Sequence, residues 1–416
     1  MSQPFRFVHA SDFHLERPLA GLADTPAHLA DLMIDAPYVA AERVCNVAIN
    51  QRADFLILAG DIVNADRAGP RAAAFLLDQF ARLSAARIAV YWAGGRAERR
   101  GPWPAELPLP ANVQRWTSSA PEPIMHHADG DALAVLVGGN RRGNDDLKIE
   151  AYPKPKGGLF AIGVAHGRLI GKRMAKSAID YWACGGSHRR RRLSAGRATA
   201  IYSGAPQART PADRGQHGAV VVTVDEQGVA QPTFVPTDAA RYVRVRAALN
   251  VAAPRSEQER TLAECIDNER ARAGGNDLFI CWNLVPTDTA GPSSAGRGAS
   301  RAAWADEWLA WLRREFGAVS PAAWSVSIEV EPPAAEDLHG DAPRDGSLLA
   351  DFLAELAASE DSADELPLAS LLPEALRSGA MAERLHIADI RQRRQVLRQA
   401  ATLGRELLGA EEADPR

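Results

Sequence analysis

The amino-acid sequence predicts an α/β fold, and three features of its N-terminal part carry this prediction. Apolar runs at residues 5–10, 54–59 and 88–92 have the length and composition of buried strands. The segments between them place apolar side chains at helical spacing, so strands and helices alternate. Each run ends in polar or glycine-rich residues, which we expect at the carboxyl edge of a parallel sheet, where ligands bind.

The N-terminal half is expected to contain two sheets. A loop over residues 15–37 precedes amphipathic helices at 38–51 and about 69–86, which accompany the first three strands. From about residue 112 the apolar runs are shorter and indicate a second sheet, with strands at 132–137, 159–164 and 179–183. Residues 199–202 and 219–224 are expected to form a closing, hairpin-like pair.

The C-terminal half predicts a small α/β unit and a helical extension. The unit has expected strands and helices at 241–250, 255–273, 277–285, 303–316 and 323–330. A mobile loop at 286–302 and a linker at 332–346 are expected from their Gly, Pro and small residues, and helices at 347–358 and 379–408 precede a polar tail at 409–416. We therefore divide the chain into a first domain at 1–240, a small α/β cap or DNA-binding domain at 241–331, the linker 332–346 and a helical segment at 347–416.

Length and composition exclude several classes of protein. A chain of 416 residues is too long for one ordinary core, so two domains and an appendage are expected. The sequence has no apolar run of about 18 residues and no signal-peptide pattern before the first strand, so we expect a cytoplasmic protein without a membrane span. The four cysteines form no C-x-x-C motif, which argues against a disulfide framework or a zinc ribbon. A net charge of −4 does not by itself indicate nucleic-acid binding.

Five side chains follow the expected strands at positions that suit a metal ion. Asp12 and His14 form a D-x-H pair after the first strand, and Asp61 ends the second. His166 and His188 each follow a strand of the second sheet. Three imidazoles and two carboxylates are ligands that suit Mn, Fe or Zn. The sequence therefore predicts a divalent-metal centre at the strand ends.

The order of these motifs resembles the metallophosphoesterase (calcineurin-like) superfamily. Residues 9–15 (His-Ala-Ser-Asp-Phe-His-Leu) and 54–61 (Asp-Phe-Leu-Ile-Leu-Ala-Gly-Asp) resemble its SbcD/YhaO branch of DNA repair exonuclease subunits, and residues 181–183 and 202–207 point to the same branch. The resemblance covers about residues 5–240. It implies a four-layer α-β-β-α sandwich with a small α/β cap domain, a helical C-terminal extension and metal-dependent hydrolysis of DNA phosphodiesters.

The resemblance implies two metal sites, which this chain matches unequally. At the first site the family ligands correspond to Asp12, His14, Asp61 and His188. The second site shares Asp61 and uses His166, and its two further ligand positions are Gly95 and Gly186 here. Because glycine has no side chain to bind a metal, we expect one ion, with manganese as the family's implied metal, rather than two.

The catalytic histidine of the family corresponds to Arg96 in this alignment, and shifting the alignment by one residue places Arg96 and Ala97 at the asparagine and histidine positions. A guanidinium stays charged near neutral pH and cannot act as a general acid, although it can bind a phosphate with two parallel hydrogen bonds. We therefore expect an exonuclease-like subunit with impaired or altered activity. The alternatives are an inactive DNA-binding or scaffold subunit of an ATPase–nuclease complex and a single-metal nucleotide phosphodiesterase.

Partner surfaces are expected outside the metal centre. The run Arg189, Arg190, Arg191 and Arg192 either follows a DNA backbone or is a solvated charge run. The apolar stripe of the 379–408 helix either folds back on its own domain or, as the resemblance implies, docks a coiled-coil SbcC/YhaN-like ATPase. The resemblance also makes a homodimer the default. Trp304, Trp308 and Trp311 are interpreted as packing residues or a partner-binding face, and His126 and His127 as loop residues without a role.

Overall fold

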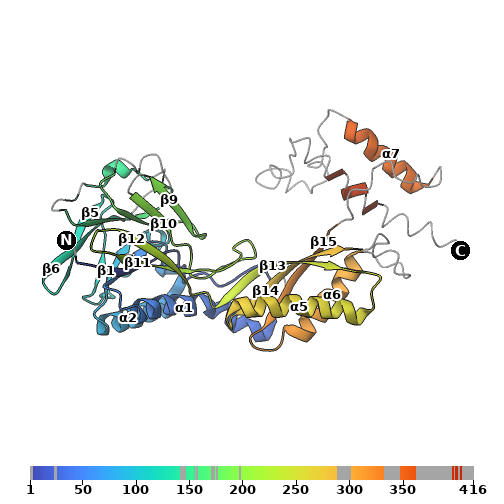
Figure 1. Ribbon diagram of the computed structural model, residues 1–416, viewed down its shortest axis with the longest axis horizontal. Helices are drawn as coiled ribbons and strands as arrows, with labels where there is room; N and C mark the ends of the chain where they lie inside the picture. The colour runs from blue at the N-terminus through green and yellow to red at the C-terminus, as the bar shows by residue number, and fades with distance from the viewer. Residues whose placement is uncertain are drawn as a thin grey trace. The chain divides into compact units, whose positions relative to one another are not determined.

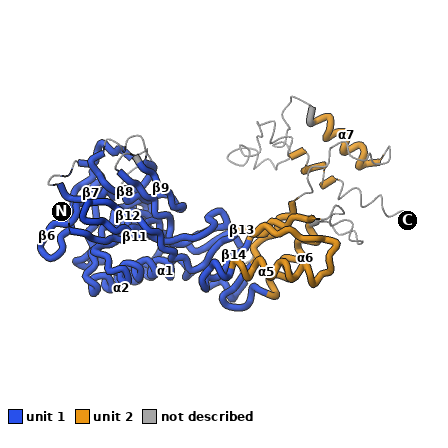
Figure 2. Tube along the Cα trace, viewed as in Figure 1, with its two compact units in different colours: residues 1–243, 270–280, 316–324 blue, residues 244–269, 281–315, 325–416 orange. Residues whose placement is uncertain are grey.

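The structure is a computed structural model that contains two compact units (Figures 1 and 2). The first unit consists of residues 1–243, 270–280 and 316–324, and the second of 244–269, 281–315 and 325–416. The residues described are 3–22, 26–140, 147–153, 155, 158–169, 174, 177–195, 198–287, 301–331, 347–361, 396–397, 399–401 and 403–404.

The N-terminal strands and helices alternate as the sequence predicts (Figure 1). The elements up to the first sheet's fourth strand are β1 (Phe5–Ala10), α1 (Ala27–Asn50), β2 (Phe55–Ala59), α2 (Ala65–Ala85), β3 (Ala89–Ala93), α3 (Arg96–Arg100) and β4 (Val113–Arg115). The remaining strands of the two large sheets are β5 (Glu122–Ala128), β6 (Asp131–Gly138), β7 (Phe160–His166), β8 (Tyr181–Gly185), β9 (Arg191–Ala195), β10 (Ala198–Tyr202), β11 (Gly218–Val224) and β12 (Ala230–Pro236).

Two six-stranded sheets of order β12-β11-β1-β2-β3-β4 and β5-β6-β7-β8-β10-β9 pack face to face. Alternate side chains of β1 divide between two cores: Phe5 and Phe7 lie between the sheets, and Val8 and Ala10 lie under α1 and α2. The outer face of the second sheet is covered by residues of the 147–179 segment, which includes a 3₁₀ turn at Ile149–Ala151. The layered α/β fold expected from the sequence is thus confirmed.

The C-terminal elements also follow the predicted order. They are β13 (Ala240–Leu249), α5 (Arg255–Ala273), β14 (Asp277–Pro286), α6 (Arg301–Phe316), β15 (Ala323–Val330) and α7 (Leu348–Asp361), and β13, β14 and β15 form a three-stranded sheet in that order. In α6, Trp308 is buried and its ring contacts Trp304 and Trp311, as the packing interpretation expects.

Much of the predicted C-terminal extension falls outside the described residues: the central part of the 286–302 loop (288–300), the linker 332–346, residues 379–395 of the last helix and the tail 409–416. The described residues between 396 and 404 are helical, and Ala401 packs against Leu349 and Leu353 of α7. None of the described helices combines the length and the apolar character that a membrane span requires.

Two helices begin earlier than predicted. Helix α1 begins at Ala27 inside the expected 15–37 loop, and Pro37 lies within it. Burial of Leu29, Met33 and Pro37 continues the helical apolar pattern back through the proline, so packing outweighs the helix-breaking tendency of that residue. Helix α2 begins at Ala65, where Asn64 caps it, and Gly69 interrupts it with a non-helical conformation.

Two further predictions about the second half of this unit are wrong. Residues 199–202 and 219–224 form no hairpin, because β10 pairs with β8 and β9 in one sheet whereas β11 lies between β1 and β12 in the other. His126 and His127 are not loop residues, because both lie in β5, where His126 is buried and its Nδ1 lies 2.9 Å from the hydroxyl of Tyr91. The pairing of β11 with β1 joins segments distant in the chain, which local sequence patterns do not reveal.

Phe7 is expected to be essential for packing of the two sheets. Its ring is fully buried, stacks on Phe55 at 5.0 Å and meets Tyr181 edge-on at 5.3 Å. We expect Phe7→Ala to lower the free energy of unfolding by about 3–5 kcal/mol because it leaves a cavity in this core. Urea unfolding followed by tryptophan fluorescence measures the change. Met125→Ala, at an exposed position, is the control with an expected effect below about 0.5 kcal/mol; equal effects of the two substitutions would contradict this account.

Candidate metal centre

The ends of β1 and β2 are joined by backbone hydrogen bonds that hold three candidate ligands in an uncommon conformation. Asp12 N–H donates to Gly60 O at 2.9 Å, and His14 N–H donates to Asp61 O at 3.0 Å. Asp12, His14 and Asp61 have φ angles of 58°, 45° and 54°, in the left-handed region that non-glycine residues rarely adopt. Such strained residues gather at functional sites, where the surrounding structure holds them.

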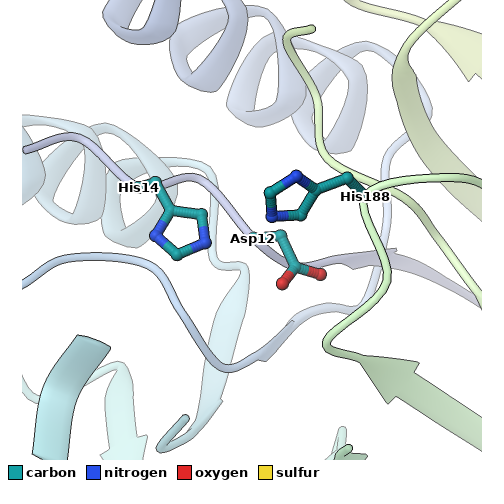
Figure 3. A group of neighbouring side chains, drawn as sticks. All are labelled: Asp12, His14 and His188. Carbon is teal, nitrogen blue, oxygen red and sulfur yellow. The ribbon is translucent and has the colours of Figure 1, made fainter. Parts of the chain in front are cut away.

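All five predicted ligands come together at this edge of the sheets. Nε2 of His14 and Nε2 of His166 lie 3.5 Å and 3.3 Å from the same oxygen, Oδ2 of Asp61. Two groups of three have ligand atoms within 4.8 Å of one another: Asp12, His14 and His188, and Asp12, Asp61 and His166. Figure 3 shows the first group, in which the side chains face a common space. The structure therefore brings the five predicted side chains together at one edge of the sheets.

The histidines are oriented by hydrogen bonds at the ring nitrogen opposite the shared oxygen. Nδ1 of His166 donates to Ala59 O at 2.9 Å, and Nδ1 of His14 donates to the Glu16 carboxylate at 3.1 Å. Glu16 in turn accepts the Asn64 N–H at 3.1 Å. This arrangement turns Nε2 of each ring toward the cluster, where it can bind a metal once it carries no proton, so the residues present fit a divalent metal.

Asp12 is held by two serine hydroxyls and by the backbone of Gly186, one of the two family ligand positions at which this chain has a glycine. Ser11 Oγ donates to Asp12 Oδ2 at 2.6 Å and lies 2.8 Å from Ser203 Oγ. The Gly186 N–H donates to both carboxylate oxygens of Asp12, at 3.2 Å and 3.0 Å. Gly186 thus contributes to the centre through its amide rather than through a side chain.

The two glycines at family ligand positions leave little room for a side chain. A Cβ atom at Gly95 would lie 2.5 Å from Asp61 Oδ1 and 3.0 Å from Cε1 of His166. At Gly186, which has a φ of +92°, a Cβ atom would lie 3.2 Å from Nε2 of His166. Neither position therefore offers a side-chain ligand to a second metal.

A buried carboxylate that sequence reasoning missed supports the loop carrying Asp61. Glu98 is 3% exposed and accepts N–H groups of Asp61 at 3.0 Å, Ile62 at 2.7 Å and Gly95 at 2.8 Å, together with the indole N–H of Trp92 at 3.3 Å. Burial, and secondly the negative charge of Asp61, raise the pKa of Glu98. Its position three residues after Gly95, in the first turn of the short helix α3, was the available sequence signal.

Burial and charge act in opposite directions within the cluster. Burial alone would raise the pKa of Asp61, but its hydrogen bond to His166 and the charges of His166 and His14 outweigh burial and hold the pKa well below its usual range. For His166, burial would lower the pKa, yet the bond to Asp61 and the charges of Asp12 and Asp61 raise it to about 9. Burial lowers the pKa of His188. The metal-free centre therefore holds a proton between His166 and Asp61 at neutral pH.

A cavity of about 290 Å³ opens over the ligands. Arg96 lines it, as do Arg17, Arg67 and Arg100, which the sequence analysis did not single out. The predicted arginine run lies elsewhere: Arg190, Arg191 and Arg192 line a second hollow of about 320 Å³, where the Arg190 guanidinium lies 4.6 Å from the ring centroid of Phe234. Arg189 donates to Ala212 O at 2.7 Å.

Comparison with known proteins relates half of the chain to a metallophosphoesterase. No protein-family model matches. The chain is 29% identical over 232 residues to a protein described as the uncharacterized metallophosphoesterase YhaO of Bacillus subtilis (strain 168), covering 52% of this chain and 57% of that protein. The match thus spans less than two thirds of the relative's own length.

A solved structure of a conserved uncharacterized protein from Streptococcus pneumoniae TIGR4, described as a predicted phosphoesterase, is 10% identical with a TM-score of 0.27, over 56% of this chain and 99% of that one. Likeness at this level carries no structural argument.

Metal affinity is expected to rise with pH. The pKa of His166 is raised from 6.5 to about 9, so the protonated ring stabilises the metal-free fold below pH 6.5, and this contribution is lost as the pH rises through 9. This proton is shared with Asp61 and must leave when a metal ion binds the Asp61 carboxylate, so Mn²⁺ affinity should increase by up to about tenfold per pH unit below that pKa. Titration calorimetry at several pH values, in buffers of different ionisation enthalpy, measures both affinity and proton release. His166→Gln should flatten the profile, and a wild-type affinity that is constant from neutral pH to the pKa of His166 would contradict this assignment.

Glu98 is expected to act as a positioning residue for Asp61. In Glu98→Gln one accepting oxygen becomes an NH₂ group, which leaves a backbone N–H of the Asp61 loop without an acceptor. We expect a loss of about 1–3 kcal/mol in the free energy of unfolding and Mn²⁺ affinity weakened about 10–100-fold. Calorimetry and urea unfolding measure the two effects. Glu122→Gln, at an exposed position of β5, is the matched control and should change neither; wild-type affinity in Glu98→Gln would rule the role out.

Proposed function

We propose, from the resemblance to the metallophosphoesterase superfamily, that this chain is an exonuclease-like subunit that hydrolyses phosphodiesters of DNA with one bound manganese ion and with reduced activity. The observation that carries the proposal is the convergence of five metal-ligand side chains in one cavity that Arg96 also lines. We propose a cytoplasmic location and a homodimer with it.

The proposed roles follow from where each side chain lies. Asp12, His14, Asp61 and His188 would hold the metal. When bound, a divalent ion at such a site lowers the pKa of a water molecule and neutralises phosphate charge. Arg96 binds the non-bridging oxygens of the phosphate through its planar guanidinium but holds its protons throughout. His166, whose Nε2 lies 3.3 Å from Oδ2 of Asp61, is the remaining titratable side chain beside these ligands and is the proposed proton-transfer residue.

The glycines at positions 95 and 186 favour reduced activity. They also keep a scaffold subunit as the second candidate function. Side chains at Gly95 and Gly186 would meet Asp61 and His166, so two protein ligands of a second metal have no place in this backbone. In the scaffold alternative the chain keeps the fold and binds DNA without cleaving it. Arg189–Arg192, which lie at or near the edge strand β9, are the proposed DNA contact in both cases.

The C-terminal helices are the proposed attachment point for a coiled-coil ATPase of the SbcC/YhaN type. Leu353 of α7 and Ala401 are buried in one apolar cluster. Leu348 and Leu403 are 66% and 54% exposed. Exposed leucines beside a packed helical pair suit a partner helix with an apolar stripe.

Metal content and cleavage test the proposal together. Protein loaded with MnCl₂ and desalted should contain about one Mn per chain by elemental analysis and should cleave labelled DNA only when the metal is present. Asp61→Asn should lose both properties while it stays folded, because asparagine tolerates the φ of 54° better than alanine. One metal without cleavage would favour the scaffold alternative, and two metals per chain would contradict the one-metal assignment.

A further inference from the structure

The cavity over the metal ligands contains more positive charge than one phosphodiester requires. Four arginines line it, Arg17, Arg67, Arg96 and Arg100, and we call them the arginine rim. Three carboxylates line the same cavity, those of Asp12, Glu16 and Asp61, and a divalent ion would balance two of their charges. The third carboxylate and the single negative charge of a phosphodiester are balanced by Arg17 and Arg96. The positive charges of Arg67 and Arg100 are then left without a balancing charge from a single phosphodiester.

The backbone brings two members of the rim together. Arg67 lies in the first turn of α2, and Arg100 is the last residue of α3. Ala65 N–H donates to Gly101 O at 3.1 Å, and a Cβ atom at Gly101 would lie 2.0 Å from Asn64 Oδ1, so the start of α2 and the end of α3 are in close contact. Asn64 itself lines the same cavity.

Helix α3 places Arg100 one helical turn away from Arg96. At the N-terminal end of α3, Ala97 N–H donates to Asp61 Oδ1 at 2.7 Å, which brings Arg96 beside the metal centre. Arg100 is four residues further on, on the same face and about 6 Å along the helix axis. The rim therefore extends from the metal ligands along one side of the cavity.

The guanidiniums of the rim are available to a ligand. Nε of Arg17 lies 3.6 Å from a carboxylate oxygen of Glu16. Within the described part of the chain, the side chains of Arg67, Arg96 and Arg100 form no ion pair, and all three residues are exposed. Like charges in one cavity repel one another, and an anion that binds between them relieves this repulsion.

We propose that Arg67 and Arg100 bind a second phosphate group of the substrate, adjacent to the phosphate that is hydrolysed. This inference rests on the proposed phosphodiesterase function and specifies its substrate class as molecules with at least two neighbouring phosphates. Such a pair occurs along a nucleic-acid strand and in a nucleoside diphosphate.

Binding without metal tests the proposal independently of hydrolysis. Calorimetry in EDTA compares a thymidine trinucleotide, which has two phosphodiesters, with the dinucleotide, which has one, and ADP with AMP. We expect the two-phosphate member of at least one pair to bind about fivefold tighter or more. In the double variant Arg67→Gln, Arg100→Gln this ratio should fall to about one. A failure of the nuclease assay leaves these measurements unaffected.

Arg99→Gln is the matched control, since Arg99 is exposed on the same helix but does not line the cavity. Its preference for two phosphates should equal that of the wild type. Preference within the oligonucleotide pair identifies a strand as the source, and preference within the nucleotide pair identifies a small nucleotide. Equal binding within both pairs, or a preference that survives the double variant, would overturn the proposal.

Discussion

The candidate site depends on the backbone pairing that continues past the ends of β1 and β2. Those strands are parallel neighbours, and their hydrogen bonds extend to the loops that carry Asp12, His14 and Asp61. The left-handed conformation of these three residues is unfavourable in isolation, so the loops need external support. Glu98 provides it for the second loop by accepting several backbone N–H groups at once.

The charge arrangement follows from this geometry. Asp61 lies between two imidazoles, and the resulting attraction outweighs the burial that would otherwise neutralise it. In the metal-free centre, the proton on His166 stabilises the negative charge of Asp61. A metal ion that binds Asp61 competes with that proton. The arginine rim adds positive charge on the side of the cavity that α3 forms.

Some elements were predictable and others were not, for identifiable reasons. Strands β1 to β3 and helix α5 have clear periodic patterns, and their positions match the expectation closely. The early start of α1 was missed because Pro37 resembles a helix terminator, and only its packing shows that the helix continues. The assignment of β10 and β11 to different sheets was missed because β11 pairs with β1, which lies at the other end of the first unit's sequence.

The sequence by itself determined the α/β class and the five candidate metal ligands, because motifs at strand ends follow from local spacing, and the family resemblance singled out Gly95 and Gly186. The tertiary structure decided what a linear pattern cannot contain. It showed that Glu16 and Glu98 orient the ligands and their loops, that Gly95 has no space for a side chain, and that Arg67 and Arg100 meet at one cavity. These facts depend on contacts between segments distant in the chain, and packing alone fixes such contacts.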